Sequence, residues 1–273
     1  MPVKYELGIS TGLACPNMPI VEAVESLCRE GAEVIELCLG AENLTPTKVK
    51  KLNDIQKSGG VAYTIHTQAS LKIDGKPDGL ELIQYLSNNR SSFDLADRVN
   101  ARWLVQHPPI IPMNYIPENN LIVAYLHFLA EISPKPVAIE TGVYRRNTNG
   151  EIIAIEDART PKRMQKYLTY SKITGIVGDV PKMSRSNQSY DNDRRCKEDI
   201  SDYILQAKRL DITFRELHIV GTNNWPEDMD FAYYTMSLLA KKHTFANLVL
   251  MIESTPERLE TALSTVKRFI INQ

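Results

Sequence analysis

The chain has 273 residues, of which 43% are hydrophobic and 24% are charged, and its formal net charge is -1. This composition is typical of a globular protein, and no apolar stretch approaches the roughly 20 residues of a membrane span. The near-zero charge excludes a global basic field that would attract nucleic acid, although it leaves a local basic groove open.

Short apolar runs recur along the chain and alternate with longer amphipathic segments. The runs are rich in β-branched residues and almost continuously hydrophobic, as strands of a parallel sheet are when both faces are buried. In chain order the predicted strands cover 5–10, 34–39, 62–67, 102–107, 137–140, 175–179, 216–220 and 248–253.

Helical patterns lie between these strands. Three of them begin near a proline, at Pro19, Pro46 and Pro256, which suits the first turn of a helix. Further helices are predicted over about 80–99, 118–132, 157–171, 199–211 and 228–243. The polar segment 180–199 has no periodicity, so it is expected to be a long loop, either a lid or partly disordered.

Eight strand-and-helix units predict a (β/α)8 barrel that occupies residues 1–273 as a single domain. An open, doubly wound sheet is the alternative. No GxGxxG motif follows the first strand, so the dinucleotide-binding version of that alternative is disfavoured.

Ionisable side chains stand at or near the carboxyl ends of seven predicted strands, where this fold places its active site. Alone, each has an ordinary explanation: Asp179 caps the following turn, His66 and His107 are satisfied core histidines, and Glu36 pairs with a basic residue. In chain order they are Glu36, His66, His107, Glu140, Asp179, His218 and Glu253.

Four of these residues come from neighbouring strands and place three carboxylates around one imidazole. They are Glu140, Asp179, His218 and Glu253. Such a cluster is strongly repulsive unless a cation sits in it. Mixed oxygen and nitrogen ligands suit Mn, Co, Zn or Mg, so a divalent metal is the predicted cofactor.

The order and spacing of the motifs IHTQAS, VQHPP, AIET, GD, LHIV and MIES resemble the xylose-isomerase-like TIM barrels. This superfamily contains sugar-phosphate isomerases and epimerases and endonuclease IV. The resemblance covers essentially the whole chain. It implies a metal held by Glu140, Asp179, His218 and Glu253, with Glu140 and Glu253 as the proton-transfer pair. By resemblance to endonuclease IV, His66 and His107 join Glu140 around a second metal. Glu36, with His66 and His107, is a candidate for a second metal or for substrate binding.

The chain departs from the family pattern at two places. Lys182 stands where the family often has a histidine, three residues after the strand-six aspartate. The stretch GTNNWPEDMDFAYY contains no histidine for a third metal. These departures favour one metal, or at most two. Lys182 is predicted to place a positive charge beside the metal or to bind a substrate hydroxyl.

Basic residues follow strands five and six. Arg145, Arg146 and Arg185 are candidates for binding a phosphate or carboxylate of the substrate, and a solvated charged loop is the alternative.

The leading hypothesis is a metal-dependent isomerase or epimerase of a small carbohydrate that works through an enediolate. The alternatives are an endonuclease IV-like enzyme acting on DNA and a non-catalytic barrel with a vestigial metal site. Four cysteines without CxxC spacing and an N-terminus without a signal-peptide pattern predict a reduced, cytoplasmic protein. No membrane partner is expected, nucleic acid is disfavoured, and an oligomer remains open.

Overall fold

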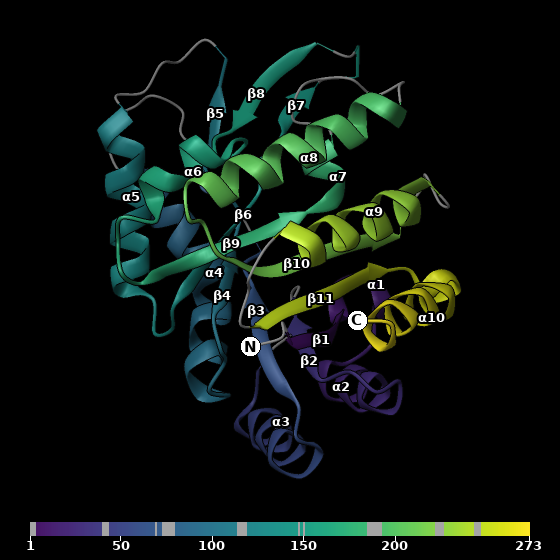
Figure 1. Cartoon of the computed structure of the whole chain (residues 1–273). Coiled ribbons are helices and arrows are strands. Elements are labelled where there is room, and N and C mark those ends of the chain that lie inside the picture. Colours follow the sequence, from purple (N-terminus) through teal and green to yellow (C-terminus); the bar gives the residue numbers. More distant parts are fainter. Residues whose placement is uncertain are drawn as a thin grey trace.

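A computed structural model places the chain in three dimensions (Figure 1). It describes residues 4–39, 44–68, 70–72, 80–113, 119–146, 148–149, 151–184, 193–221, 227–242 and 247–273.

Eight parallel strands close into a barrel, as the sequence predicts. Around the barrel the order is β1-β11-β10-β9-β6-β4-β3-β2, so consecutive parallel strands are neighbours and the last one returns to the first. The strands are β1 Lys4–Ser10, β2 Val34–Leu37, β3 Ala62–His66, β4 Leu104–Gln106, β6 Val137–Glu140, β9 Ile173–Asp179, β10 Phe214–Gly221 and β11 Asn247–Ser254.

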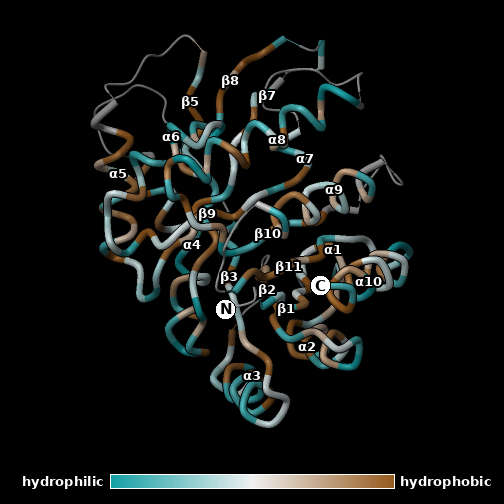
Figure 2. The backbone as a smooth tube through the Cα atoms, viewed as in Figure 1, coloured by the Kyte–Doolittle hydropathy of each residue, from teal (hydrophilic) through white to brown (hydrophobic). Residues whose placement is uncertain are grey.

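Helices surround the barrel, and their apolar faces cover its outer surface (Figures 1 and 2). Thr45 caps the first turn of α3, Pro46 stands in that turn as the sequence predicts, and the left-handed Gly60 ends the helix. The helices are α1 Thr11–Ala14, α2 Ile20–Arg29, α3 Pro46–Gly59, α4 Leu80–Arg98, α5 Asn119–Ile132, α6 Pro161–Tyr167, α7 Val180–Ser184, α8 Asp193–Arg209, α9 Glu227–Lys242 and α10 Pro256–Ile271.

Two predicted boundaries are wrong. The helix expected over 157–171 is limited to α6, because Thr160 caps it and the chain before it is strand and turn. The loop expected over 180–199 is helical at both ends. Arg194 pairs with Glu198 one turn later, and Cys196 and Ile200 are buried, so α8 begins earlier than predicted. Residues 185–192 lie outside the described part of the chain.

A small antiparallel sheet, which the sequence analysis did not predict, lies beside the carboxyl ends of β4 and β6 (Figure 1). Its order is β5-β8-β7, with β5 Ile110–Pro112, β7 Tyr144–Arg146 and β8 Ile152–Glu156. The sheet approaches the barrel closely at Gly142. A Cβ atom on that residue would lie 2.5 Å from the Glu156 carbonyl oxygen, so only glycine fits there.

Inside the barrel an apolar layer lies below a polar one. Val34, Val249 and Met251 form one buried interior cluster, and Val105, Ala138 and Val177 form another. Side chains two residues apart in a strand point to the same face. Two residues after five of these positions stand Glu36, His107, Glu140, Asp179 and Glu253. The apolar layer therefore forms a floor, and the polar residues gather above it at the mouth.

Candidate metal and proton-transfer site

The structure brings the predicted site residues together at the carboxyl ends of the barrel strands. Several sets of three offer ligand atoms that all lie within 4.8 Å of one another. Those sets are His66 with Glu140 and His218, Glu36 with His66 and Glu253, Glu36 with Glu216 and His218, and Asp179 with His218 and Glu253.

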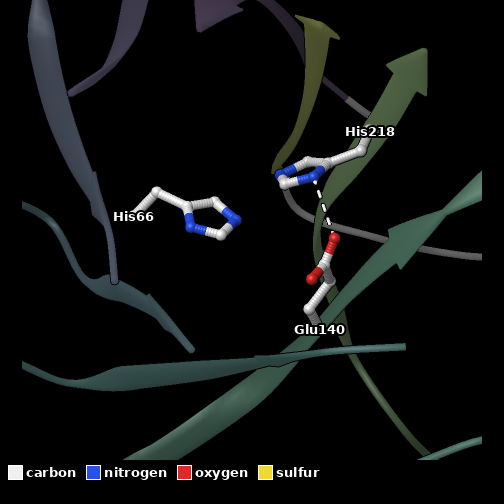
Figure 3. A group of neighbouring side chains, drawn as sticks. All are labelled: His66, Glu140 and His218. Atoms are coloured by element: carbon white, nitrogen blue, oxygen red, sulfur yellow. Dashed lines mark ion pairs between the residues drawn. The ribbon is translucent and has the colours of Figure 1, made fainter. Parts of the chain in front are cut away.

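His218 is the centre of the cluster. Its side chain is fully buried, and its Nδ1 atom lies 3.5 Å from Glu140 Oε1 and 3.4 Å from Glu253 Oε1. On the other side of the ring, Nε2 lies 3.5 Å from Glu36 Oε2. Figure 3 shows Glu140 pointing at His218, with His66 facing them from β3. Burial alone would lower the pKa of His218, but Glu253 and Glu36 raise it well above its usual range.

The imidazoles of His66 and His107 are neighbours, with ring centroids 4.7 Å apart. His107 Nδ1 lies 2.5 Å from Glu140 Oε2. The Nδ1 atom of His66 lies 2.9 Å from the carbonyl oxygen of Thr67, and a carbonyl can only accept a hydrogen bond. Nδ1 of His66 is therefore the donor, and its other ring nitrogen is left with a lone pair when the ring is neutral.

Lys182 reaches into the cluster from α7. Its Nζ atom lies 2.8 Å from Glu140 Oε2 and 3.5 Å from Asp179 Oδ2. Burial by itself would lower the pKa of Lys182, but Glu140 and Asp179 raise it far above its usual range, so the side chain is an ammonium. Burial would likewise raise the pKa of Glu140, whereas Lys182 and His107 hold it well below its usual value. The predicted positive charge beside these carboxylates is thus the Lys182 ammonium itself.

Asp179 also caps the helix that follows it. Its Oδ1 accepts a hydrogen bond of 2.8 Å from the Lys182 backbone N–H, and its own N–H donates to Thr141 Oγ1. The capping role that the sequence allowed for Asp179 is therefore confirmed. The carboxylate is fixed in place between a helix N-terminus and an ammonium, even though burial raises its pKa.

The opposite side of the mouth has no such ammonium. Among the described residues, neither Glu36 nor Glu253 has a lysine or arginine as an ion-pair partner, and both contact His218 instead. Burial raises the pKa of Glu253 to about 7, and Glu36 adds to that rise. Burial would also raise the pKa of Glu36, but His66 and His218 lower it. Negative charge is thus less well compensated on this side.

Sequence reasoning missed three residues of the site. Glu216, two residues before His218, receives a hydrogen bond of 2.6 Å from Trp103 Nε1 and lies 3.3 Å from His218 Nε2. The spacing in ELHIV carried the signal, since two residues apart in a strand means one face. Cys38 lies 3.9 Å from Glu36 Oε1, and Glu156 contributes to the raised pKa of Lys182. No simple pattern marks these last two residues.

The predicted anion-binding arginines are only partly described. Arg145 on β7 pairs with Glu156 of β8, so an anionic substrate would have to compete with that carboxylate. The side chain of Arg146 and the whole of Arg185 lie outside the part of the chain that the structure describes. Their roles remain predictions.

Comparison with known structures gives full-length matches at low identity. A D-tagatose 3-epimerase-like protein matches with a TM-score of 0.65 at 14% identity, covering 98% of this chain and 97% of that one. The 3-keto-D-glucoside 4-epimerase YcjR from E. coli matches with a TM-score of 0.63 at 13% identity, covering 99% and 100%. Endonuclease IV from Thermus thermophilus matches with a TM-score of 0.65 at 10% identity, covering 98% and 99%.

The fold is that of the xylose-isomerase-like TIM barrels. No protein-family model matches the chain, and neither does any curated protein sequence. At these identities the likeness establishes the xylose-isomerase-like fold, and the chemistry has to be argued from the side chains.

The side chains at the mouth of this xylose-isomerase-like barrel fit a divalent metal. Carboxylate oxygens and imidazole nitrogens are the donor types that Mn, Co and Zn take. Glu36 Oε2 and His218 Nδ1 are buried and form no hydrogen bond among the described residues, and their contacts within the cluster are ion pairs at 3.4–3.5 Å. Buried polar atoms without partners are uncommon in native proteins, and a bound ion is one explanation for them.

A cavity of about 590 Å³ adjoins this side of the mouth. It is lined by the segment after β1 and by the end of β2, and its lining includes Thr11, Cys38 and Lys48. Cys38 connects it to Glu36. A volume of this order is typical of pockets that hold small molecules. Among the described residues, no helix is both long enough and apolar enough to span a bilayer.

Proposed function

We propose that the protein is a divalent-metal-dependent isomerase or epimerase of a small carbohydrate. The observation that carries this proposal is that the carboxylates of two glutamates converge on one atom, His218 Nδ1. Glu140 Oε1 and Glu253 Oε1 lie 3.5 and 3.4 Å from the same His218 nitrogen, and they come from strands on different sides of β10. We infer that a substrate bound beside His218 would lie within reach of both carboxylates, one to remove a proton from carbon and one to return it.

The two glutamates differ in basicity. Lys182 and His107 hold Glu140 as an anion, whereas Glu253 has a pKa of about 7 because it is buried. A group with a pKa near the working pH is the better general base, so Glu253 takes the proton and Glu140 provides a fixed negative charge or returns a proton. When bound, the divalent ion supplies Lewis-acid polarisation of the substrate carbonyl and favours an enediolate.

The fold and the electrostatics support the same assignment. Structures with this fold include proteins described as D-tagatose 3-epimerase-like and as L-ribulose 3-epimerase. The cavity lined by Cys38, which contacts Glu36, has the size of a small-molecule pocket. Lys182 adds a permanent positive charge that would attract a hydroxyl or an enediolate oxygen. A substrate phosphate is less favoured, because the described Arg145 is already paired.

Exchange of a substrate proton with solvent tests the proposal directly. The protein is incubated with Mn²⁺ and a panel of ketoses in D₂O, and deuterium on the carbon beside the carbonyl is measured by mass spectrometry. We expect exchange by the wild type and none by Glu253→Gln or Glu140→Gln, because an amide cannot accept the proton. Glu198→Gln, on the exposed face of α8, is the matched control. Exchange that survives both site variants would contradict the assignment.

One observation favours a second candidate, a metal-dependent phosphodiesterase acting on DNA. His66, His107 and Glu140 are grouped on one side of the mouth, and a second metal site is expected there if the chain works like endonuclease IV. Cleavage of duplex DNA with an abasic site, lost in His107→Asn, would support this candidate. A chain that binds no divalent metal and catalyses neither reaction would instead be a non-catalytic barrel. Metal content per chain, measured by elemental analysis, separates the three.

A further inference from the structure

We propose that the divalent ion binds on the side of the mouth formed by β2, β3 and β11, where Glu36, His66 and Glu253 hold it. Beside Glu140 and Asp179, the Lys182 ammonium stands in place of a metal. This inference rests on the metal of the proposed function. It changes the ligands that the resemblance implied, because two of those four residues already have a cation.

Lys182 already neutralises two of the carboxylates that the resemblance assigned to a metal. Its ammonium contacts both Glu140 and Asp179, at 2.8 and 3.5 Å. A divalent ion bound by those two carboxylates would lie against a fixed positive charge, which is repulsive at close range in a buried site. Asp179 is further committed, since its second oxygen accepts a hydrogen bond from the Lys182 backbone.

The side of the mouth formed by β2, β3 and β11 offers a separate set of metal-binding atoms. One ligand atom each from Glu36, His66 and Glu253 lies within 4.8 Å of the other two, so a single ion can contact all three after small rotations. Glu36 is fully buried, and its Oε2 has no hydrogen-bond partner among the described residues. That oxygen faces the centre of the cluster, 3.5 Å from His218 Nε2. Its charged partners among the described residues are therefore imidazoles, with no lysine or arginine beside it.

A backbone contact fixes which ring nitrogen of His66 carries the proton. Because its Nδ1 donates to the Thr67 carbonyl, the ring is fixed in orientation and its other nitrogen is available as a ligand. In Figure 3 a ring nitrogen of His66 points toward His218. A backbone carbonyl behind a histidine is a common arrangement for metal-binding imidazoles.

Binding of Co²⁺ tests the inference without any substrate. The metal-free protein is titrated with Co²⁺ while its visible absorption is recorded, and Mn²⁺ binding is measured in parallel by calorimetry. We expect Glu36→Gln and His66→Asn each to weaken binding by about tenfold or more, and Asp179→Asn to change it by less than about twofold. Glu198→Gln and His127→Asn, outside the site, are the matched controls.

Two results of these titrations would overturn the inference. If Asp179→Asn weakens binding tenfold and Glu36→Gln does not, the ion lies on the Asp179 side and the inference fails. It also fails if the wild-type protein binds neither ion. Circular dichroism of each variant checks that it has folded. If Glu36→Gln does not fold, the Co²⁺ affinity of His66→Asn is compared with that of Asp179→Asn instead. Deuterium exchange does not enter this test, so the absence of sugar chemistry would leave the ligand assignment intact.

Discussion

Lys182 and Glu140 form a salt bridge inside the mouth of the barrel, with Nζ 2.8 Å from Oε2. The bridge joins the end of strand β6 to the short helix that follows β9. It exists because β9 ends at Asp179 and α7 starts at the next residue, so one helical turn returns the lysine side chain over the strand ends. The lysine therefore neutralises Glu140 and Asp179, two of the residues that the family resemblance assigned to a metal.

Removing this ammonium should destabilise the metal-free protein and make it more responsive to metal. In Lys182→Met a buried Glu140 loses its cation, so we expect the free energy of unfolding to fall by about 3 kcal/mol. Added Mn²⁺ should raise the melting temperature of this variant more than that of the wild type, because the vacated carboxylates become ligands.

Thermal denaturation with and without Mn²⁺ measures both effects. Lys51→Met, on the exposed face of α3, is the control. An unchanged melting temperature in metal-free Lys182→Met would show that the bridge contributes nothing to stability.

The acid sensitivity of folding should depend on a salt bridge at the opposite end of the barrel. Arg102 donates two hydrogen bonds to Glu6, of 2.7 and 3.0 Å, and this lowers the pKa of Glu6. A carboxyl whose pKa is lower in the folded state stabilises the fold above the unfolded pKa, and that stability is lost as the pH falls through the folded pKa. The loss is therefore expected below about pH 4.

Glu6→Gln should reduce stability at pH 7 by about 1–2 kcal/mol and should flatten the acid side of the stability profile. Urea unfolding at several pH values measures this. Glu198→Gln, which removes an exposed pair, should leave the profile unchanged. A Glu6→Gln profile parallel to that of the wild type would refute the assignment.

A methyl group at Gly142 should disturb the attachment of the small sheet to the barrel. The new Cβ would meet the carbonyl oxygen of Glu156 at 2.5 Å, and a backbone atom cannot rotate away. We expect Gly142→Ala to cost about 1–3 kcal/mol of stability. Gly59→Ala in α3 is the matched control, because its Cβ meets nothing closer than 4.0 Å. Equal stability of the two variants in urea would contradict this expectation.

The barrel and most of its mouth were predictable from sequence because their determinants are local. Most barrel strands are short apolar runs, and in five of them an ionisable residue stands two positions beyond an inward apolar one. The small sheet was not predictable, since β5 and β7 have three residues each and carry no periodic signal.

Other features of the site depend on three-dimensional contacts. Glu216 lies within a strand, and its spacing from His218 shows only that the two share a face, so its partner Trp103 becomes visible only in the structure. The pairing of Lys182 with Glu140 required knowing that a helix, and not a loop, begins at Val180. The contact of the Lys182 ammonium with Glu140 and Asp179 is therefore visible only once the strand ends are placed together.

The hydrogen bond from Trp103 to Glu216 makes the indole an optical probe of the mouth. Trp103 lies among the apolar residues of the barrel floor, and only one carboxylate separates it from His218. The chain has a single other tryptophan, Trp225, so a Trp225→Phe background would leave one intrinsic fluorophore. Any event that changes the charge on His218 would then be recorded as a shift in emission, with no label attached to the protein.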